Sequence, residues 1–365
     1  QMCIRDSIST FNLFLQRSLG DIYFDSIASF QARRADRLRL AGAVPSLDSD
    51  DAAARFSTQS YTIGFQDDWQ ITPDFQLTYG ARYDLFNNPE RPQLNTNFTG
   101  RLGFPNSFTF TGRGVLQPRI GFNWQATDRL IIRGGAGIFG GGTPDVFLSN
   151  SFSNTGQLTN LVDITRANCA ASGTCGALDG VTGTSYPASL TNFLVNNTAS
   201  LALAPVNAID PDLELASQLR ATLSASYEAD LGPLGDGWLF GADFLYGNIV
   251  NAYQWTDRRS VPIGTLPDGR TRYGPLNGIA TTNQDLVMTN STGGRSFIGV
   301  ARVSKAWDFG LTVDASYTRS DVTDVNAITS ATAGSLYSNN AFVDPNIPAE
   351  GTSIYQIKDP VSYTH

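Results

Sequence analysis

The stretch YTIGFQDDWQITPDFQLTYGARYDLF, residues 61–86, decides the fold. Apolar side chains occupy alternate positions over 61–71 and again over 75–85, and Asp67 is the one fault in the first run. Pro73-Asp74, between the two runs, is a turn signal because proline presets the backbone angle of a tight turn. Two alternating runs around a short turn predict an antiparallel β-hairpin with one apolar face and one polar face.

The same pattern recurs along the chain. Further hairpins are expected over 120–140, 219–246 and 295–320, each closed by a short turn. A less regular pair of strands is expected within 8–36, around 11–15 and 22–24. Long polar segments separate the hairpins, over 37–60, 88–116, 141–214 and 257–294.

The connections therefore alternate between short and long. Connections in soluble domains are mostly about 4–6 residues, and loops beyond roughly 12–15 residues are uncommon. Outer-membrane barrels have this rhythm, with short periplasmic turns, long extracellular loops, and strands of about 10 residues that are apolar outside and polar inside. The sequence predicts an all-β fold, an antiparallel transmembrane β-barrel. The alternative is a soluble β protein whose aromatic residues form an ordinary core.

The tryptophans and the charged strand residues follow the same scheme. Because Trp favours the membrane interface, those near the short turns are predicted to form an aromatic girdle: Trp69, Trp124, Trp238 and Trp307. Several charges fall on the polar face and are expected to line the lumen: Arg82, Asp84, Arg133, Arg220, Glu228, Asp243 and Arg302. Since a charge removed from water needs compensation, mutual pairing is the expected role of these side chains, ahead of solute contact.

A glycine-rich stretch suggests a competing function. LIIRGGAGIFGGGTPD, residues 130–145, contains the G-x-G-x-x-G pattern as Gly135, Gly137 and Gly140. A dinucleotide site needs a helix directly after the glycines and an acidic residue about 20 positions on, at the end of a second strand. Neither an amphipathic helix nor such an acidic residue is expected here. The glycines are assigned to a strand, where they permit bending and close backbone approach. The net charge of −8 also argues against a nucleic-acid partner.

Few residues suit catalysis or metal binding. His365 is the only histidine, so His-dependent triads and His-based metal sites lack their base or ligand, and no enzyme activity is expected. Cys169 and Cys175 lie in the longest segment, where a disulfide is favoured over free thiols or zinc. The acidic clusters at 47–51 and 210–212 offer oxygen ligands for a loop calcium, but their spacing fits a solvated acidic loop better, and no cofactor is expected.

The residues at 117–156, QPRIGFNWQATDRLIIRGGAGIFGGGTPDVFLSNSFSNTG, resemble the barrel of Oar-like TonB-dependent outer-membrane receptors. The stretches 66–86, 209–255 and 301–326 share the resemblance, which covers most of 60–345. It implies a plugged barrel of about 22 strands. Such receptors import large or scarce nutrients and are energised by the TonB–ExbB–ExbD complex through a plug and a TonB box. This chain is then expected to hold roughly ten to twelve strands of a monomeric barrel in outer-membrane lipid.

Solute contact is expected from the long loops. The candidates lie in the segment 141–214: Phe147, Asn150, Phe152 and Asn154. The ends of the chain, 1–7 and 361–365, resemble translated sequencing-adapter sequence, so residues 8–360 are expected to be the natural part.

Two other functions remain open. One is a passive porin or an outer-membrane adhesin on the same architecture. The other is a soluble β-rich carbohydrate-active enzyme, with Asp84 and Asp243 as candidate acids that would have to lie about 5–10 Å apart.

Overall fold

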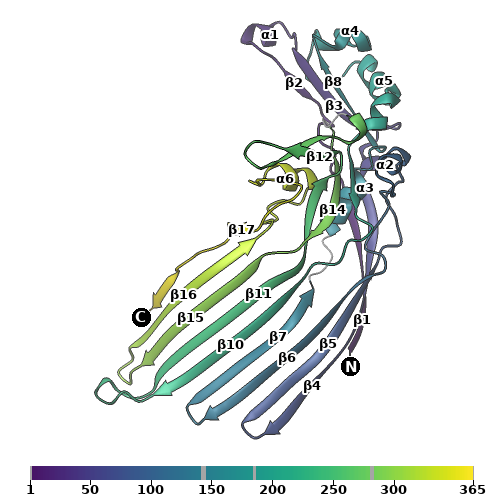
Figure 1. The fold of residues 1–365 in the computed structure, drawn as a ribbon. Helices are drawn as coiled ribbons and strands as arrows, with labels where there is room; N and C mark the ends of the chain where they lie inside the picture. Colours follow the sequence, from purple (N-terminus) through teal and green to yellow (C-terminus); the bar gives the residue numbers. More distant parts are fainter. Residues whose placement is uncertain (1, 141–144, 184–185, 280–282, 365) are drawn as a thin grey trace.

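One large antiparallel sheet dominates the computed structural model, which describes residues 2–140, 145–183, 186–279 and 283–364 (Figure 1). The order of its long strands is β1-β4-β5-β6-β7-β10-β11-β15-β16, so strands that follow one another along this path are mostly close in sequence. Its two outer strands do not pair with each other within the described residues, so the sheet is open. The large antiparallel sheet confirms the all-β prediction.

The long strands carry the predicted hairpins. They are β1 (Met2–Asn12), β4 (Ala54–Thr72), β5 (Phe75–Asn87), β6 (Arg113–Thr127), β7 (Leu130–Gly140), β10 (Ser217–Ala229), β11 (Trp238–Asp257), β15 (Arg295–Ala306) and β16 (Thr312–Asp324). Two short strands, β17 (Gly351–Thr352) and β18 (Val361–Thr364), pair with β16. The hairpins β4–β5, β6–β7, β10–β11 and β15–β16 all turn at the same end of the sheet, which confirms these predictions (Figure 1).

The pairing register separates a polar face from an apolar face. Asn123, Arg133, Ser224 and Asp243 lie opposite one another on successive strands. Residues directly opposite each other in a ladder point to the same side of a sheet. The neighbouring row runs from Trp124 through Ile132, Ala225 and Ala242 and is apolar. The period-two pattern of single strands therefore builds two faces across β6, β7, β10 and β11, although Leu245 of β11 lies on the polar face opposite Thr222.

The glycines of the G-x-G-x-x-G pattern lie inside β7. An ideal Cβ on Gly135 would lie 2.9 Å from the carbonyl oxygen of Ile120, and one on Gly137 would lie 2.9 Å from that of Pro118. The glycines thus allow close approach of β6 and β7. A short helix, α3, follows at Asp145–Ser153. It is not the amphipathic helix of a dinucleotide site, because Phe147 to Ser153 are all buried, polar and apolar residues alike. Gly141 and Gly142 lie outside the described residues.

The other end of the sheet carries a folded assembly, here called the loop layer, formed by the described residues of 13–53, 88–112, 145–216, 252–294 and 325–350 (Figure 1). Its strands are β2 (Asp21–Tyr23), β3 (Arg37–Ala43), β8 (Thr159–Thr165), β9 (Val206–Ile209), β12 (Ser260–Thr265), β13 (Thr271–Pro275) and β14 (Asp285–Ser291), together with the end of β11. Its helices are α1 (Ile27–Gln31), α2 (Thr96–Leu102), α3, α4 (Cys169–Ser172), α5 (Ala188–Asn196) and α6 (Ala333–Ser338). Short 3₁₀ turns are η1 (Ser49–Ala52), η2 (Cys175–Leu178), η3 (Thr198–Leu203) and η5 (Leu276–Gly278), and η4 (Gly232–Leu234) lies in the β10–β11 turn.

The buried apolar core lies in and under the loop layer. One cluster joins the upper ends of β4, β6 and β11 to α3, α6 and β14, and includes Phe56, Phe147 and Trp255. A second cluster packs β3 and β8 against α5 and the segment around Cys169. The large sheet instead leaves its apolar side chains exposed below these clusters, as expected of a wall that faces lipid. No helix among the described residues is long and apolar enough to cross a membrane.

The predicted strand pair within 8–36 is wrong. β1 pairs with β4 in the large sheet, whereas β2 pairs with β3 in the loop layer. Ile22 and Phe24 pack against the second core cluster, which draws this segment away from β1. β1 also departs from the two-face pattern, because Ile4 lies opposite Thr62 on the polar face and Arg5 lies opposite Tyr61 on the apolar face.

Candidate functional site

The polar face of the large sheet is the first candidate surface. The register places all the predicted lumen charges on it: Arg82, Asp84, Arg133, Arg220, Glu228, Asp243 and Arg302. Asp84 is buried and accepts hydrogen bonds from Thr62 Oγ1 at 2.6 Å, Arg82 Nε at 2.7 Å and Gln117 Nε2 at 2.6 Å. This carboxylate therefore ties β4, β5 and β6 together.

The other charges of this face are less tightly held. Arg302 lies 3.6 Å from Asp243 across β11 and β15. Arg133 Nε donates to Asn123 Oδ1 at 3.2 Å. The guanidinium of Arg220 lies 5.7 Å from the ring centre of Phe139. The polar face is thus a wall of mixed charge with its cations spread over several strands.

The four tryptophans predicted for the girdle lie towards the short-turn end. Trp69 and Trp124 are exposed on the apolar face. Trp238 and Trp307 meet edge to face with ring centres 5.8 Å apart, and Trp238 Nε1 donates to Leu234 O at 3.1 Å. Asp67, the fault in the apolar run, accepts a 2.9 Å hydrogen bond from the Tyr79 hydroxyl on the neighbouring strand, so its carboxylate has a partner.

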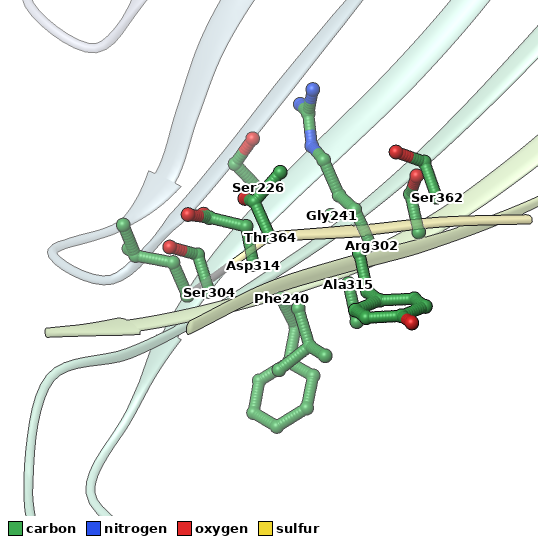
Figure 2. Close-up of a pocket in the computed structure, with 13 residues that line it drawn as sticks. Ser226, Phe240, Gly241, Arg302, Ser304, Asp314, Ala315, Ser362 and Thr364 are labelled. Atoms are coloured by element: carbon green, nitrogen blue, oxygen red, sulfur yellow. The ribbon is translucent and has the colours of Figure 1, made fainter. Parts of the chain in front are cut away.

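A cavity of about 380 Å³ lies on the wall beside β18. Figure 2 shows that Ser226, Arg302 and Asp314 point to one side of the sheet and Phe240 points to the other, as the register requires. One side of this cavity is formed by residues 362–364, within the stretch expected to be foreign.

A larger groove of about 740 Å³ lies in the loop layer. It is bounded by residues 14–17, the end of α3, the start of β8, β9, residues 283–286 and α6. Its lining is rich in asparagine, glutamine, serine and threonine. No sequence motif marks it, because its walls come from segments more than 300 residues apart.

The predicted solute-contact residues separate into two groups. Phe147 and Phe152 are 5 % and 7 % exposed in the first core cluster, and Phe152 stacks on Phe56 with ring centres 4.7 Å apart. Asn150 and Asn154 line the groove. Asn150 Nδ2 donates to Ala331 O at 2.9 Å, which joins α3 to the segment before α6. Within the described residues, the asparagines are therefore the members of this set that reach a cavity.

Cys169 and Cys175 form a disulfide that closes a small loop between α4 and η2. The acidic clusters are engaged in local contacts. Asp48 accepts from the backbone N–H of Asp50, and Asp210 lies 3.0 Å from Arg258. Over the described ranges, no three His, Cys, Asp or Glu side chains gather in a way that would hold a metal ion.

Replacing both Cys169 and Cys175 with serine is expected to cost about 2 kcal/mol, the entropy of closing so short a loop. The loss should stay within the second core cluster, where Cys169 is buried. Hydrogen exchange of the backbone amides of residues 160–180, in the full-length protein, measures this loss of local stability. Unchanged protection of these amides in the double variant would contradict the expectation.

A buried ion cluster, missed by sequence reasoning, holds the centre of the loop layer. Asp285 and Arg259 are both 0 % exposed, and Arg259 Nη2 donates to Asp285 Oδ1 at 2.8 Å. Arg101 Nε donates to Asp285 Oδ2 at 2.9 Å. These residues come from α2, the β11–β12 turn and β14, so no local spacing reveals them.

Two titratable groups of the loop layer have raised pKa values, Asp257 beside this cluster and Tyr273 on β13. Burial raises the pKa of Asp257, although Ser260 and the backbone N–H groups of Arg259 and Asp285 hydrogen-bond to its carboxylate. Burial, together with the Asp344 carboxylate, raises the pKa of Tyr273 to about 12. The Tyr273 hydroxyl therefore stays protonated at neutral pH and donates to Asp344.

A family model agrees with this geometry. The family model described as "Outer membrane beta barrel domain" matches residues 11–362. No curated protein matches the chain.

Solved structures of outer-membrane proteins are similar at a low level. A mutant of the ferric enterobactin receptor of Pseudomonas aeruginosa has 12 % identity and a TM-score of 0.41, over 78 % of this chain and 31 % of that one. An outer membrane transporter of Escherichia coli has 12 % identity and a TM-score of 0.39, over 74 % and 25 %. A siderophore receptor of Pseudomonas aeruginosa has 10 % identity and a TM-score of 0.38, over 88 % and 44 %. This chain spans a quarter to less than half of their lengths. With its matched family model and its two-faced sheet, the chain belongs to the outer membrane beta barrel domain family, and its large sheet is barrel wall in the outer membrane.

Proposed function

We propose that this chain is part of the barrel of an Oar-like TonB-dependent receptor, an energised transporter of a scarce solute. The observation that carries the proposal is the continuous polar wall beneath a folded loop layer. In a barrel, the polar face lines the lumen and the long loops face outward. The loop layer would bind the solute, and the wall would frame its path.

The wall acts by binding alone: its side chains can contact a plug or line the path of a solute, and no covalent step is required. Its arginines and carboxylates are spread over β5, β7, β10, β11 and β15, so they can make separate contacts with a plug or a passing solute. The resemblance of 117–156 to Oar-like receptors supports a plug that moves when TonB pulls on it. TonB–ExbB–ExbD is the partner that this proposal requires.

The soluble-enzyme alternative has little support from the candidate acids. Asp84 and Asp243 lie on β5 and β11, with β6, β7 and β10 between them. At about 4.8 Å per strand step, the four steps put them roughly 19 Å apart across the sheet. The register also offsets them along the strands, because Asp84 lies opposite Val115 of β6 and the row of Asp243 reaches Asn123 of β6. The two acids are therefore well beyond the ~5–10 Å of paired glycosidase acids.

The test uses the full-length gene, expressed in a strain with TonB and in a strain without it. We expect an outer-membrane protein that is heat-modifiable on gels and that cross-links to TonB in cells. Deleting the TonB box should abolish the cross-link and leave the gel mobility unchanged.

Two results would replace the proposal. An outer-membrane barrel without plug, TonB box or cross-link is a passive porin or adhesin. A monomer that stays in the soluble fraction would instead support the soluble β-rich enzyme.

A further inference from the structure

The amide-rich groove of the loop layer has the chemistry of a binding site. We propose that it binds a neutral, hydroxyl-rich ligand, an oligosaccharide, on the outer side of the membrane. The inference rests on the proposed function, because it names the solute class that the loop layer captures before transport.

The lining carries almost no charge. It contains no Asp or Glu, and Arg17 is its one cation among the described residues. Arg17 Nε donates to Asp21 Oδ2 at 2.9 Å, so this charge is compensated outside the groove. An anionic ligand such as a phosphate or a carboxylate-rich chelate needs unpaired cations, which this lining does not offer.

One buried polar group in the lining lacks a partner. Ser153 is 6 % exposed, and its Oγ has no hydrogen bond within the described residues. Buried polar groups are almost always hydrogen-bonded, so this hydroxyl indicates a ligand that supplies the missing bond. The side-chain amides of Asn207 and Asn154, in the same lining, make no hydrogen bond in the described parts of the chain and reach solvent, so they are open to a ligand in the groove.

The unpaired groups suit hydroxyl partners. An asparagine amide both donates and accepts, and a serine hydroxyl does the same. Sugar hydroxyls also donate and accept, so each can satisfy an amide without bringing a charge into the groove. A ligand with many such groups in a row matches a lining in which amides and hydroxyls alternate among several segments.

The rim of the groove adds an apolar surface. Phe14 lines it and is 47 % exposed. The C–H faces of a pyranose ring can pack on such an aromatic ring while its hydroxyls face the amides. The volume of about 740 Å³ lies within the roughly 300–1,000 Å³ range of small-molecule sites.

The test measures binding of the purified full-length receptor to a glycan array that carries neutral and acidic oligosaccharides and control peptides. We expect binding to neutral oligosaccharides, weakened at least tenfold in Ser153→Ala and in Asn207→Ala. Ser151→Ala is the matched control, because Ser151 is a fully buried serine of the same helix, also lacks a partner, and lies outside the groove lining. It should bind like the parent.

Heat-modifiable gel mobility shows that each variant is folded. Binding to acidic glycans or peptides only, no binding to any neutral oligosaccharide, or equal binding by the Ser153 and Ser151 variants would overturn the inference. TonB cross-linking is scored separately on the same proteins. A receptor that cross-links to TonB without binding neutral glycans refutes the inference and keeps the transport proposal. A receptor that binds neutral glycans without cross-linking to TonB supports the inference and refutes the transport proposal.

Discussion

Replacing Asp285 with asparagine is expected to lower the stability of the loop layer by about 3–5 kcal/mol, the usual cost of removing one partner from a buried ion pair. Asp285 is fully buried and accepts from both Arg259 and Arg101. Asparagine keeps the size of the side chain but removes the negative charge. Two guanidinium groups are then left in a buried site without a counter-ion, and burying an uncompensated charge is strongly unfavourable.

Asp257→Asn is the matched control for this prediction. The asparagine Oδ1 can still accept from the backbone N–H groups of Arg259 and Asp285, and its amide can donate to Ser260 Oγ. The cost should therefore be much smaller than at Asp285. Pulse proteolysis of the full-length protein across a urea series measures the stability of both variants. Equal losses of stability in Asp285→Asn and Asp257→Asn would contradict the role given to the Asp285 ion cluster.

Asp257 should also make the stability depend on pH. Burial raises the pKa of Asp257, so the fold disfavours its ionised form at pH values above that pKa. This cost is relieved as the pH falls through the raised pKa, so the Asp257 contribution to stability rises on acidification. Asp257→Asn removes that contribution. A stability difference between parent and variant that stays constant from neutral to acidic pH would contradict the assignment.

Arginine at position 223 is expected to destabilise the barrel by about 2–4 kcal/mol, whereas arginine at 222 should be nearly neutral. Leu223 lies near the middle of β10 on the apolar face, opposite Phe244. Thr222, its neighbour, lies on the polar face. A charge on the lipid face near the bilayer centre loses its hydration, and a charge on the lumen face keeps it.

Folding of the full-length protein into lipid vesicles, followed by heat-modifiability over a urea series, measures this difference. Adjacent positions share the same strand and the same depth, so the pair isolates the effect of the face. Equal destabilisation by Leu223→Arg and Thr222→Arg would show that the two faces do not differ in environment.

The strands of the wall were predictable because their side chains obey a strict local period. In 61–86 and 219–246, each alternation spans one strand and each turn carries its own signal, so pairing follows from neighbouring sequence. The seven wall charges could be placed on one face for the same reason. Their partners could not, because the contact between Asp243 and Arg302 depends on inter-strand register.

The loop layer was predictable only in part. β3 alternates Arg37 and Arg39 with Leu38 and Leu40, a visible strand signal, but its partner β8 begins more than 100 residues later. The sequence predicts Phe147 and Phe152 as solute-contact residues of a long loop, because nothing local shows that α3 buries both rings in the first core cluster. The groove and the Asp285 cluster are assembled from distant segments, and only the fold brings them together.

The central claim is that the short turns face the periplasm and the loop layer faces the outside of the cell. The most direct test is labelling of intact cells with a membrane-impermeant maleimide, in a full-length protein whose free cysteines have been replaced by serine. Thr265→Cys, exposed on the β12–β13 hairpin, and Asp308→Cys, exposed in the β15–β16 turn, are the two probes. The account predicts labelling of position 265 in intact cells and of position 308 only after the outer membrane is permeabilised. Labelling of 308 in intact cells with 265 protected would contradict it.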